Sequence, residues 1–176
     1  MARDEHELLE RIEEAKHAFG CKCSKLAGSV TVEVLRLVLR GLGITLSTRD
    51  VFIRGVPVEV DLLLPTRAAK PQHGLVYQPT DVLAAFEVKN SGSFGDDTLN
   101  SVRRSFQLIR AANPRVYCAY VTLAERKGYK WAATTDNLGA EVFTLFWHNG
   151  SSASRRYEPT GHWEKFVGKL KSLDHG

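Results

Sequence analysis

Apolar residues recur at helical spacing in four segments of this 176-residue chain. Each segment shows the pattern of a helix that buries one face against a core. The predicted helices cover residues 4–19, 30–43, 96–112 and 163–173. The second of them is apolar on nearly all sides, so we expect it to be mostly buried. Ser29 is its expected N-cap, and Gly41 or Gly43 its expected stop.

Five other segments have the apolar runs or alternation of β-strands. They cover residues 51–55, 56–65, 81–89, 115–124 and 141–150. In the second, alternation places Val60, Leu62 and Leu64 on one face and Asp61 on the other. Between the second and third lies a long connection with two prolines, residues 66–80. This order predicts an α/β fold, with a central mixed sheet of about five strands flanked by helices.

Charged residues lie within these apolar elements, where burial makes an unpaired charge costly. Glu87 and Lys89 are two positions apart in one strand, so their side chains point the same way. Asp61 lies in another strand, and Glu33 lies on the mostly apolar helix. If the two strands are neighbours, Asp61 and Glu87 meet and repel each other. A divalent cation with oxygen ligands relieves that repulsion.

Each of these residues also has a purely structural interpretation. Glu87 and Lys89 form an ion pair on the face of an edge strand, and Asp61 accepts a backbone hydrogen bond at a strand end. Glu33 pairs with Arg36 or Arg40 on its own helix. It is least favoured that all three structural interpretations hold at once.

The order of these residues resembles the PD-(D/E)XK nuclease superfamily, which has the restriction-endonuclease-like fold. Asp61 is followed by the E-x-K of Glu87 and Lys89, and a helix with Glu33 precedes them. GSVTVEVLRLVLRGLG is similar to the family's first helix and AFEVKNSG to its E-x-K strand, so the resemblance spans residues 28–124. Val60 stands where the motif has proline, and residues 66–80 must loop out for Asp61 to meet Glu87.

The resemblance implies an endonuclease that hydrolyses DNA with Mg²⁺ or Mn²⁺, of restriction, repair or junction-resolving type. It implies that Lys89 acts on the attacking water, and that Gln107 faces the active site. The implied metal ligands are Asp61, Glu87, the Val88 carbonyl and Glu33. The implied nucleic-acid contacts are Arg103, Arg110, Arg36 and Asn90.

The length of the chain suits a single domain, so we expect one nuclease-like domain over residues 1–176. Its parts are an N-terminal helix and connector (1–27), a catalytic core (28–124) and a C-terminal strand and helix (125–176). Cutting both strands of a duplex with one site per chain favours a homodimer. The alternatives are an RNA endonuclease of the same fold, a catalytically silent module that binds nucleic acid, and an unrelated α/β domain.

The net charge of +4 is modest, but the excess of basic over acidic residues lies downstream of residue 100. Such a surface attracts polyanions, although it also describes ordinary solvated faces. His17, Cys21 and Cys23 suggest half of a zinc site, and without a second pair of ligands reduced thiols are favoured. With no membrane-length apolar run and no secretory signal, we expect a cytoplasmic protein and no membrane partner.

Overall fold

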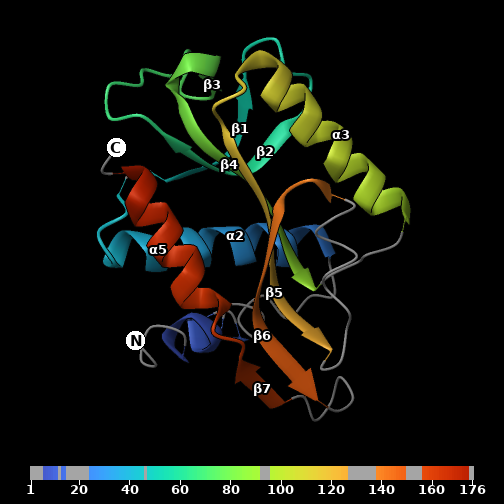
Figure 1. Ribbon diagram of the computed structural model, residues 1–176. Helices are drawn as coiled ribbons and strands as arrows, with labels where there is room; N and C mark the ends of the chain where they lie inside the picture. The colour runs from blue at the N-terminus through green and yellow to red at the C-terminus, as the bar shows by residue number, and fades with distance from the viewer. Residues whose placement is uncertain are drawn as a thin grey trace.

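The computed structural model describes residues 6–11, 13–14, 24–45, 47–91, 96–126, 138–149 and 156–174. Its centre is a mixed seven-stranded sheet in the order β3-β1-β2-β4-β5-β6-β7, with helices packed around it (Figure 1). The expected α/β fold with a mixed, helix-flanked sheet is therefore confirmed. His17, Cys21 and Cys23 lie outside the described residues.

Residues 6–11 and 13–14 are helical, within the first predicted helix. The elements that follow are α2 (Ser24–Gly41), β1 (Thr48–Ile53), β2 (Glu59–Pro65), β3 (Val76–Tyr77), the 3-10 turn η1 (Pro79–Asp81), β4 (Val82–Ser91), α3 (Asp96–Ala112), β5 (Tyr117–Arg126), β6 (Glu141–Asn149), β7 (Arg156–Pro159) and α5 (His162–Asp174). The two strands beyond the expected five are β3 and β7, which are too short to carry a periodic signal.

Strands β4, β5 and β6 run parallel in the middle of the sheet, and β1, β2 and β4 pair antiparallel. Parallel neighbours need a crossover, and α3 supplies it between β4 and β5. The connection 66–80 closes on itself, because the Thr66 N–H donates to the Asp81 carbonyl at 2.8 Å. It loops out as the sequence required and brings β4 back beside β2.

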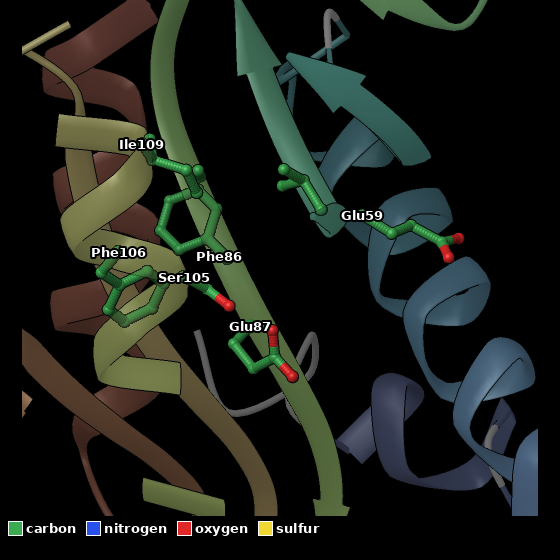
Figure 2. A pocket seen from close by; sticks show the side chains of 8 residues that line it. Glu59, Phe86, Glu87, Ser105, Phe106 and Ile109 are labelled. Carbon is green, nitrogen blue, oxygen red and sulfur yellow. The ribbon is translucent and has the colours of Figure 1, made fainter. Parts of the chain in front are cut away.

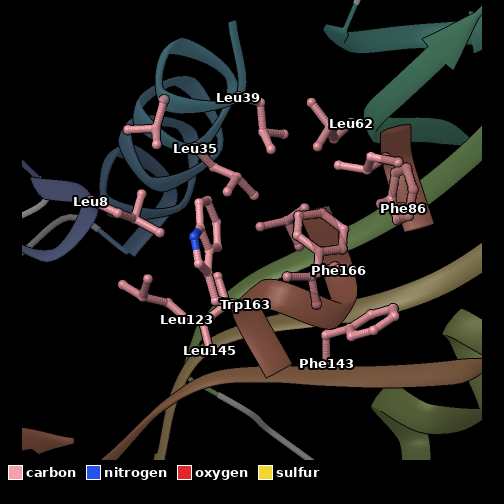
Figure 3. Close-up of a cluster of buried hydrophobic side chains, with 14 of the residues drawn as sticks. Leu8, Leu35, Leu39, Leu62, Phe86, Leu123, Phe143, Leu145, Trp163 and Phe166 are labelled. Atoms are coloured by element: carbon pink, nitrogen blue, oxygen red, sulfur yellow. The ribbon is translucent and has the colours of Figure 1, made fainter. Parts of the chain in front are cut away.

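Two hydrophobic cores hold the helices on the sheet. In the first, Leu35 and Leu39 of α2 and Phe166 of α5 pack with Leu62 and Phe86 (Figure 3). In the second, α3 contributes Val102, Phe106 and Ile109 against side chains of β1, β2, β4 and β5. Helix α2 buries one face, and Glu33, Arg36 and Arg40 are half-buried or exposed on the other.

The two ends of α2 differ in how well the sequence predicted them. The helix begins at Ser24, so Ser29 lies inside it and is not its N-cap. The β-branched run after Ser29 did not stop the helix, because packing overrides weak propensity. It ends at Gly41, as expected, and Gly43 follows with a φ of 90°. No helix in the described ranges combines the length and the apolar character needed to cross a membrane.

Candidate active site

A reversal of side-chain direction in β1 and β2 sets up the site. The register pairs Arg49 with Leu62 and Val51 with Val60. Val51 and Val60 pack in the second core, whereas Leu62 packs in the first. Residues two apart in an ideal strand share a face, so the prediction that Val60 and Leu62 do so is wrong. Both strands change face at the level of Asp50 and Asp61.

Asp50 explains the reversal in β1. Its φ is 52°, in the left-handed region that a non-glycine residue rarely adopts. The register places Asp50 opposite Asp61, between the pairs Arg49–Leu62 and Val51–Val60. Where a strand changes face, one side chain is free to point sideways. Asp61 is the residue of β2 at this level, and its carboxylate reaches across to β4.

The sideways Asp61 carboxylate lies where β2 separates from β4. The paired residues at this end of the ladder are Leu62 and Phe86. Beyond them Asp61 Oδ2 accepts the N–H of Val88 at 2.9 Å, so a side chain replaces the next backbone bond. The N–H and C=O of one strand residue point to the same edge, so the Val88 carbonyl also faces this gap.

Lys89 brings the predicted residues of the site together. Its Nζ lies 2.5 Å from Glu87 Oε1 and 3.3 Å from Asp61 Oδ2. Glu87 and Lys89 therefore point the same way, as predicted, and Asp61 meets them from the neighbouring strand. Their strand β4 is the fourth of seven, so the ion pair does not lie on an edge strand. Asp61 also makes the backbone hydrogen bond that its structural interpretation required.

The electrostatics of this trio favour a cation. Burial, and then the charge of Asp61, raise the pKa of Glu87 above its usual range. Burial lowers the pKa of Lys89, but the charges of Glu87 and Asp61 outweigh it and raise that pKa overall. The carboxylates of Asp61 and Glu87, with a backbone carbonyl beside them, form a set of oxygen donors of the kind that Mg²⁺ prefers. The residues present therefore fit a divalent cation.

A small cavity of about 10 Å³ lies beside Glu87, with room for about one water molecule. Its lining includes Glu59, Val60, Phe86 and three residues of α3 (Figure 2). Those three are Ser105, Phe106 and Ile109, and Gln107 is not among them. Gln107 is exposed, because two residues turn a helix by about 200°. Ser105 thus holds the position beside Glu87 that the sequence assigned to Gln107.

Glu33 stands in a different set of contacts. Its carboxylate lies 2.6 Å from Arg36 Nη2 and 2.7 Å from Arg49 Nε. The hydrogen bond from Arg36 is the main cause that lowers the pKa of Glu33, against the opposing effect of burial. Within the described residues, no three His, Cys, Asp or Glu side chains gather closely enough to hold a metal. The structure thus brings Asp61 and Glu87 together, but does not add Glu33 to them.

The pairing of Glu33 with Arg36 matches its structural interpretation, whereas Arg49 was missed. Arg49 also lies 2.5 Å from Asp50, so one guanidinium joins α2 to β1 beside the reversal. Nothing in the local pattern marks Arg49, because its partner on α2 is sixteen positions away. Only the packing of α2 on β1 brings the two charges together.

The predicted nucleic-acid contacts lie in different places. Arg36 is held by Glu33, and Arg110 Nη1 donates to the Gly139 carbonyl at 3.0 Å, near the C-terminal end of α3. Arg103 is half-buried on the same helix. Asn90 is half-buried and directly follows Lys89 on β4. Of the four, Asn90 lies nearest in the chain to the carboxylate pair.

No protein-family model matches the sequence, and no curated protein matches it. Solved structures do match the fold. NucC of E. coli MS115-1, in its cAAA-bound form, aligns with a TM-score of 0.68 and 13% identity over 98% of this chain and 88% of that chain. NucC of P. aeruginosa ATCC27853, also in a cAAA-bound form, aligns with a TM-score of 0.67 and 10% identity over 97% and 89%.

At such low identity the likeness concerns the fold. The chain has a restriction-endonuclease-like fold, as the order of its motifs implied.

Proposed function

We propose that this chain is a metal-dependent endonuclease that hydrolyses phosphodiester bonds of DNA at Asp61, Glu87 and Lys89. One observation carries the proposal: a lysine ammonium lies between two carboxylates from neighbouring strands, at the point where those strands separate. The likeness in fold to NucC supports a nuclease. The reaction would use Mg²⁺ or Mn²⁺.

The proposed roles follow from the positions of the side chains. Asp61, Glu87 and the Val88 carbonyl would hold the cation. When bound, it would polarise the scissile phosphate and lower the pKa of a coordinated water. Lys89 would position the attacking water and offset the charge that develops on the phosphate oxygens. The hydrogen bond from the Val88 N–H keeps the Asp61 carboxylate aimed into the gap.

Glu33 has two possible roles in this proposal, as a metal ligand or as an anchor for arginine side chains. As a ligand of a second cation it would have to exchange its bonds to Arg36 and Arg49 for metal bonds. As an anchor it would hold Arg49 at the edge of the site. We propose the second role for the resting enzyme, because both arginine bonds are short and partly buried.

The test separates metal binding from catalysis. Supercoiled plasmid, branched DNA and RNA are incubated with the protein in Mg²⁺, in Mn²⁺ and in EDTA. Because both NucC structures are cAAA-bound forms, each assay is run with and without cAAA. The variants are Lys89→Met, Asp61→Asn and Glu87→Gln, and Lys171→Met on the exposed face of α5 is the control. Mn²⁺ affinity is measured by calorimetry.

We expect metal-dependent cleavage of DNA that Lys89→Met reduces at least about 100-fold while Mn²⁺ still binds. Asp61→Asn and Glu87→Gln should lose both Mn²⁺ binding and cleavage, and Lys171→Met neither. Cleavage of RNA alone would move the substrate to RNA. Binding of nucleic acid that is equal in EDTA, with no cleavage of any substrate, would identify a silent binding module instead.

A further inference from the structure

A second feature of the surface is not used by the proposed reaction. An open groove of about 580 Å³ lies at the first residues of β5 and β6, where α3 and α5 both end nearby. Its polar lining consists of three cations, one tyrosine and one carboxylate. These residues are Arg110, Arg115, Lys169, Tyr117 and Glu141. The volume is in the range of ligand-binding sites, and the excess of positive charge selects for an anion.

The side chains of the groove hold one another in place. Arg110 Nη1 donates to the Gly139 carbonyl at 3.0 Å, and Lys169 Nζ lies 4.5 Å from the centre of the Tyr117 ring. The Tyr117 hydroxyl donates to Glu141, so the one carboxylate of the groove is already engaged. Arg110 and Lys169 are thus arranged before any ligand arrives, which lowers the entropy that binding must overcome, and Arg115 is exposed at the rim.

The groove lies within reach of a nucleic acid bound at the candidate active site. Tyr117 pairs with Ala84 and Tyr120 pairs with Glu87 in the parallel ladder. Three residues of strand correspond to about 10 Å. Along the strands this separation corresponds to about three base pairs of a duplex, at roughly 3.4 Å each. Glu87 lies against α3 on one face of the sheet, whereas Tyr117 packs against the first core on the other face, so the route between the two places runs along α3. Helix α3 joins the two places, because Ile109 lines the cavity beside Glu87 and Arg110 lines the groove.

We propose that this groove is a second contact for nucleic acid, in which Arg110, Arg115 and Lys169 bind backbone phosphates beside the scissile position. The proposal rests on the proposed function for its partner, but it concerns binding and not cleavage. It assigns Arg110 to the groove together with Arg115 and Lys169. Contacts of this kind set affinity and register and carry no sequence preference.

The experiment measures binding in EDTA, where no metal-dependent turnover occurs, so its outcome does not depend on catalysis. A short labelled DNA duplex is titrated with the protein between about 50 and 200 mM salt, and affinity is followed by fluorescence anisotropy. The test variant is Arg110→Gln, Arg115→Gln and Lys169→Gln together. The matched control removes three exposed cations of the same helices and charge: Arg104→Gln, Lys165→Gln and Lys171→Gln.

We expect the test variant to bind about ten-fold more weakly, with a salt slope smaller by roughly 0.9 for each phosphate that it no longer neutralises. The control variant should change the affinity and the salt slope much less. Glu141→Gln should bind about two-fold more tightly, since it removes the one negative charge of the groove. A gain in affinity cannot come from a damaged fold, so this variant guards against that explanation.

Three outcomes would overturn the proposal. The first is equal affinity and slope for the test and control variants, and the second is weaker binding by Glu141→Gln with an unchanged melting temperature. The third is the absence of wild-type binding to DNA at low salt. Loss of cleavage in Lys89→Met with unchanged DNA affinity would support a contact in the groove that is separate from catalysis. If the groove variants bound DNA like the control while Lys89→Met abolished cleavage, the proposed nuclease function would stand and the groove proposal would not.

Discussion

We expect the direction of the Asp61 side chain to depend on the backbone of Asp50, which lies opposite it. A left-handed residue inside a strand turns the following side chains to the other face, and Asp61 lies opposite this turn. The left-handed conformation costs about 1–2 kcal/mol for most residues and less for Asp, Asn and Gly. A non-glycine residue held there by its surroundings is often found at functional sites. Asp50 is therefore a positioning residue for the candidate metal ligand.

Substitutions of Asp50 test this geometry. Asp50→Gly and Asp50→Asn tolerate a positive φ, so both should keep Mn²⁺ affinity and stability. Asp50→Val should lower the free energy of unfolding by about 1–2 kcal/mol, because a β-branched side chain is strained at this φ. It should also weaken Mn²⁺ binding, because Asp61 turns away from the gap. Urea unfolding and calorimetry measure the two effects.

Thr48→Val is the control for Asp50→Val, since it also places valine in this strand, at a residue whose φ is not positive. If Asp50→Val matched Thr48→Val in stability and in Mn²⁺ affinity, the backbone of Asp50 would not position Asp61. If Asp50→Gly lost Mn²⁺ while remaining folded, the carboxylate of Asp50 and not its φ would be the important feature.

At the scale of elements, helix α2 is attached to β1 through charge as well as through apolar packing. Glu33 of α2 forms ion pairs with Arg36 on its own helix and with Arg49 on β1. Arg49 forms a further ion pair with Asp50. The arginines lower the pKa of Glu33. A carboxyl group with a lowered folded pKa stabilises the fold above its unfolded pKa, and this stability is lost as the pH falls through the folded value.

Glu33→Gln should therefore lower the free energy of unfolding at pH 7 by about 1 kcal/mol, at the upper end for partly exposed ion pairs. The difference from wild type should shrink as the pH falls below about 4.5 and through the folded pKa. Mn²⁺ affinity should stay within about two-fold, because Glu33 anchors arginines in the resting protein. Arg40→Gln, exposed on the same helix, should change stability by less than about 0.5 kcal/mol.

A larger loss of Mn²⁺ affinity in Glu33→Gln would restore Glu33 as a metal ligand. A pH-independent difference in stability would mean that the ion pairs are not its cause. Urea unfolding between about pH 3 and pH 7 distinguishes these outcomes.

At the scale of the whole molecule, one chain carries one candidate site. A single site cuts one strand of a duplex at a time, and concerted cutting of both strands needs a second copy. The expectation of a homodimer follows from this argument and from the proposed activity on DNA. The described structure holds one chain, so the expectation stays a prediction.

Sedimentation and plasmid cleavage test the assembly together. We expect the mass of two chains in solution, and linear plasmid that forms without an accumulating nicked intermediate. A single-chain mass with nicked circles as the first product would contradict the homodimer. Measuring both at several salt concentrations separates assembly from the salt-dependent binding of DNA.

Local patterns along the chain are enough to predict the elements and the chemistry of the central strand. Periodicity located the helices and the longer strands because it is a local property of the chain. Glu87 and Lys89 were assigned to one side because alternation along a regular strand is local as well. Asp61 was singled out because a carboxylate in an apolar strand needs a partner.

How these residues meet depends on the packing of segments that are distant in the chain. The sideways turn of Asp61 follows from Asp50 on another strand, and Arg49 meets Glu33 through the packing of α2 on β1. Ser105, and not Gln107, lies beside Glu87 because the packing of α3 in the second core turns one face of the helix to the sheet. The basic groove joins residues of α3, β5, β6 and α5. Each depends on the register between distant segments, which no local pattern encodes.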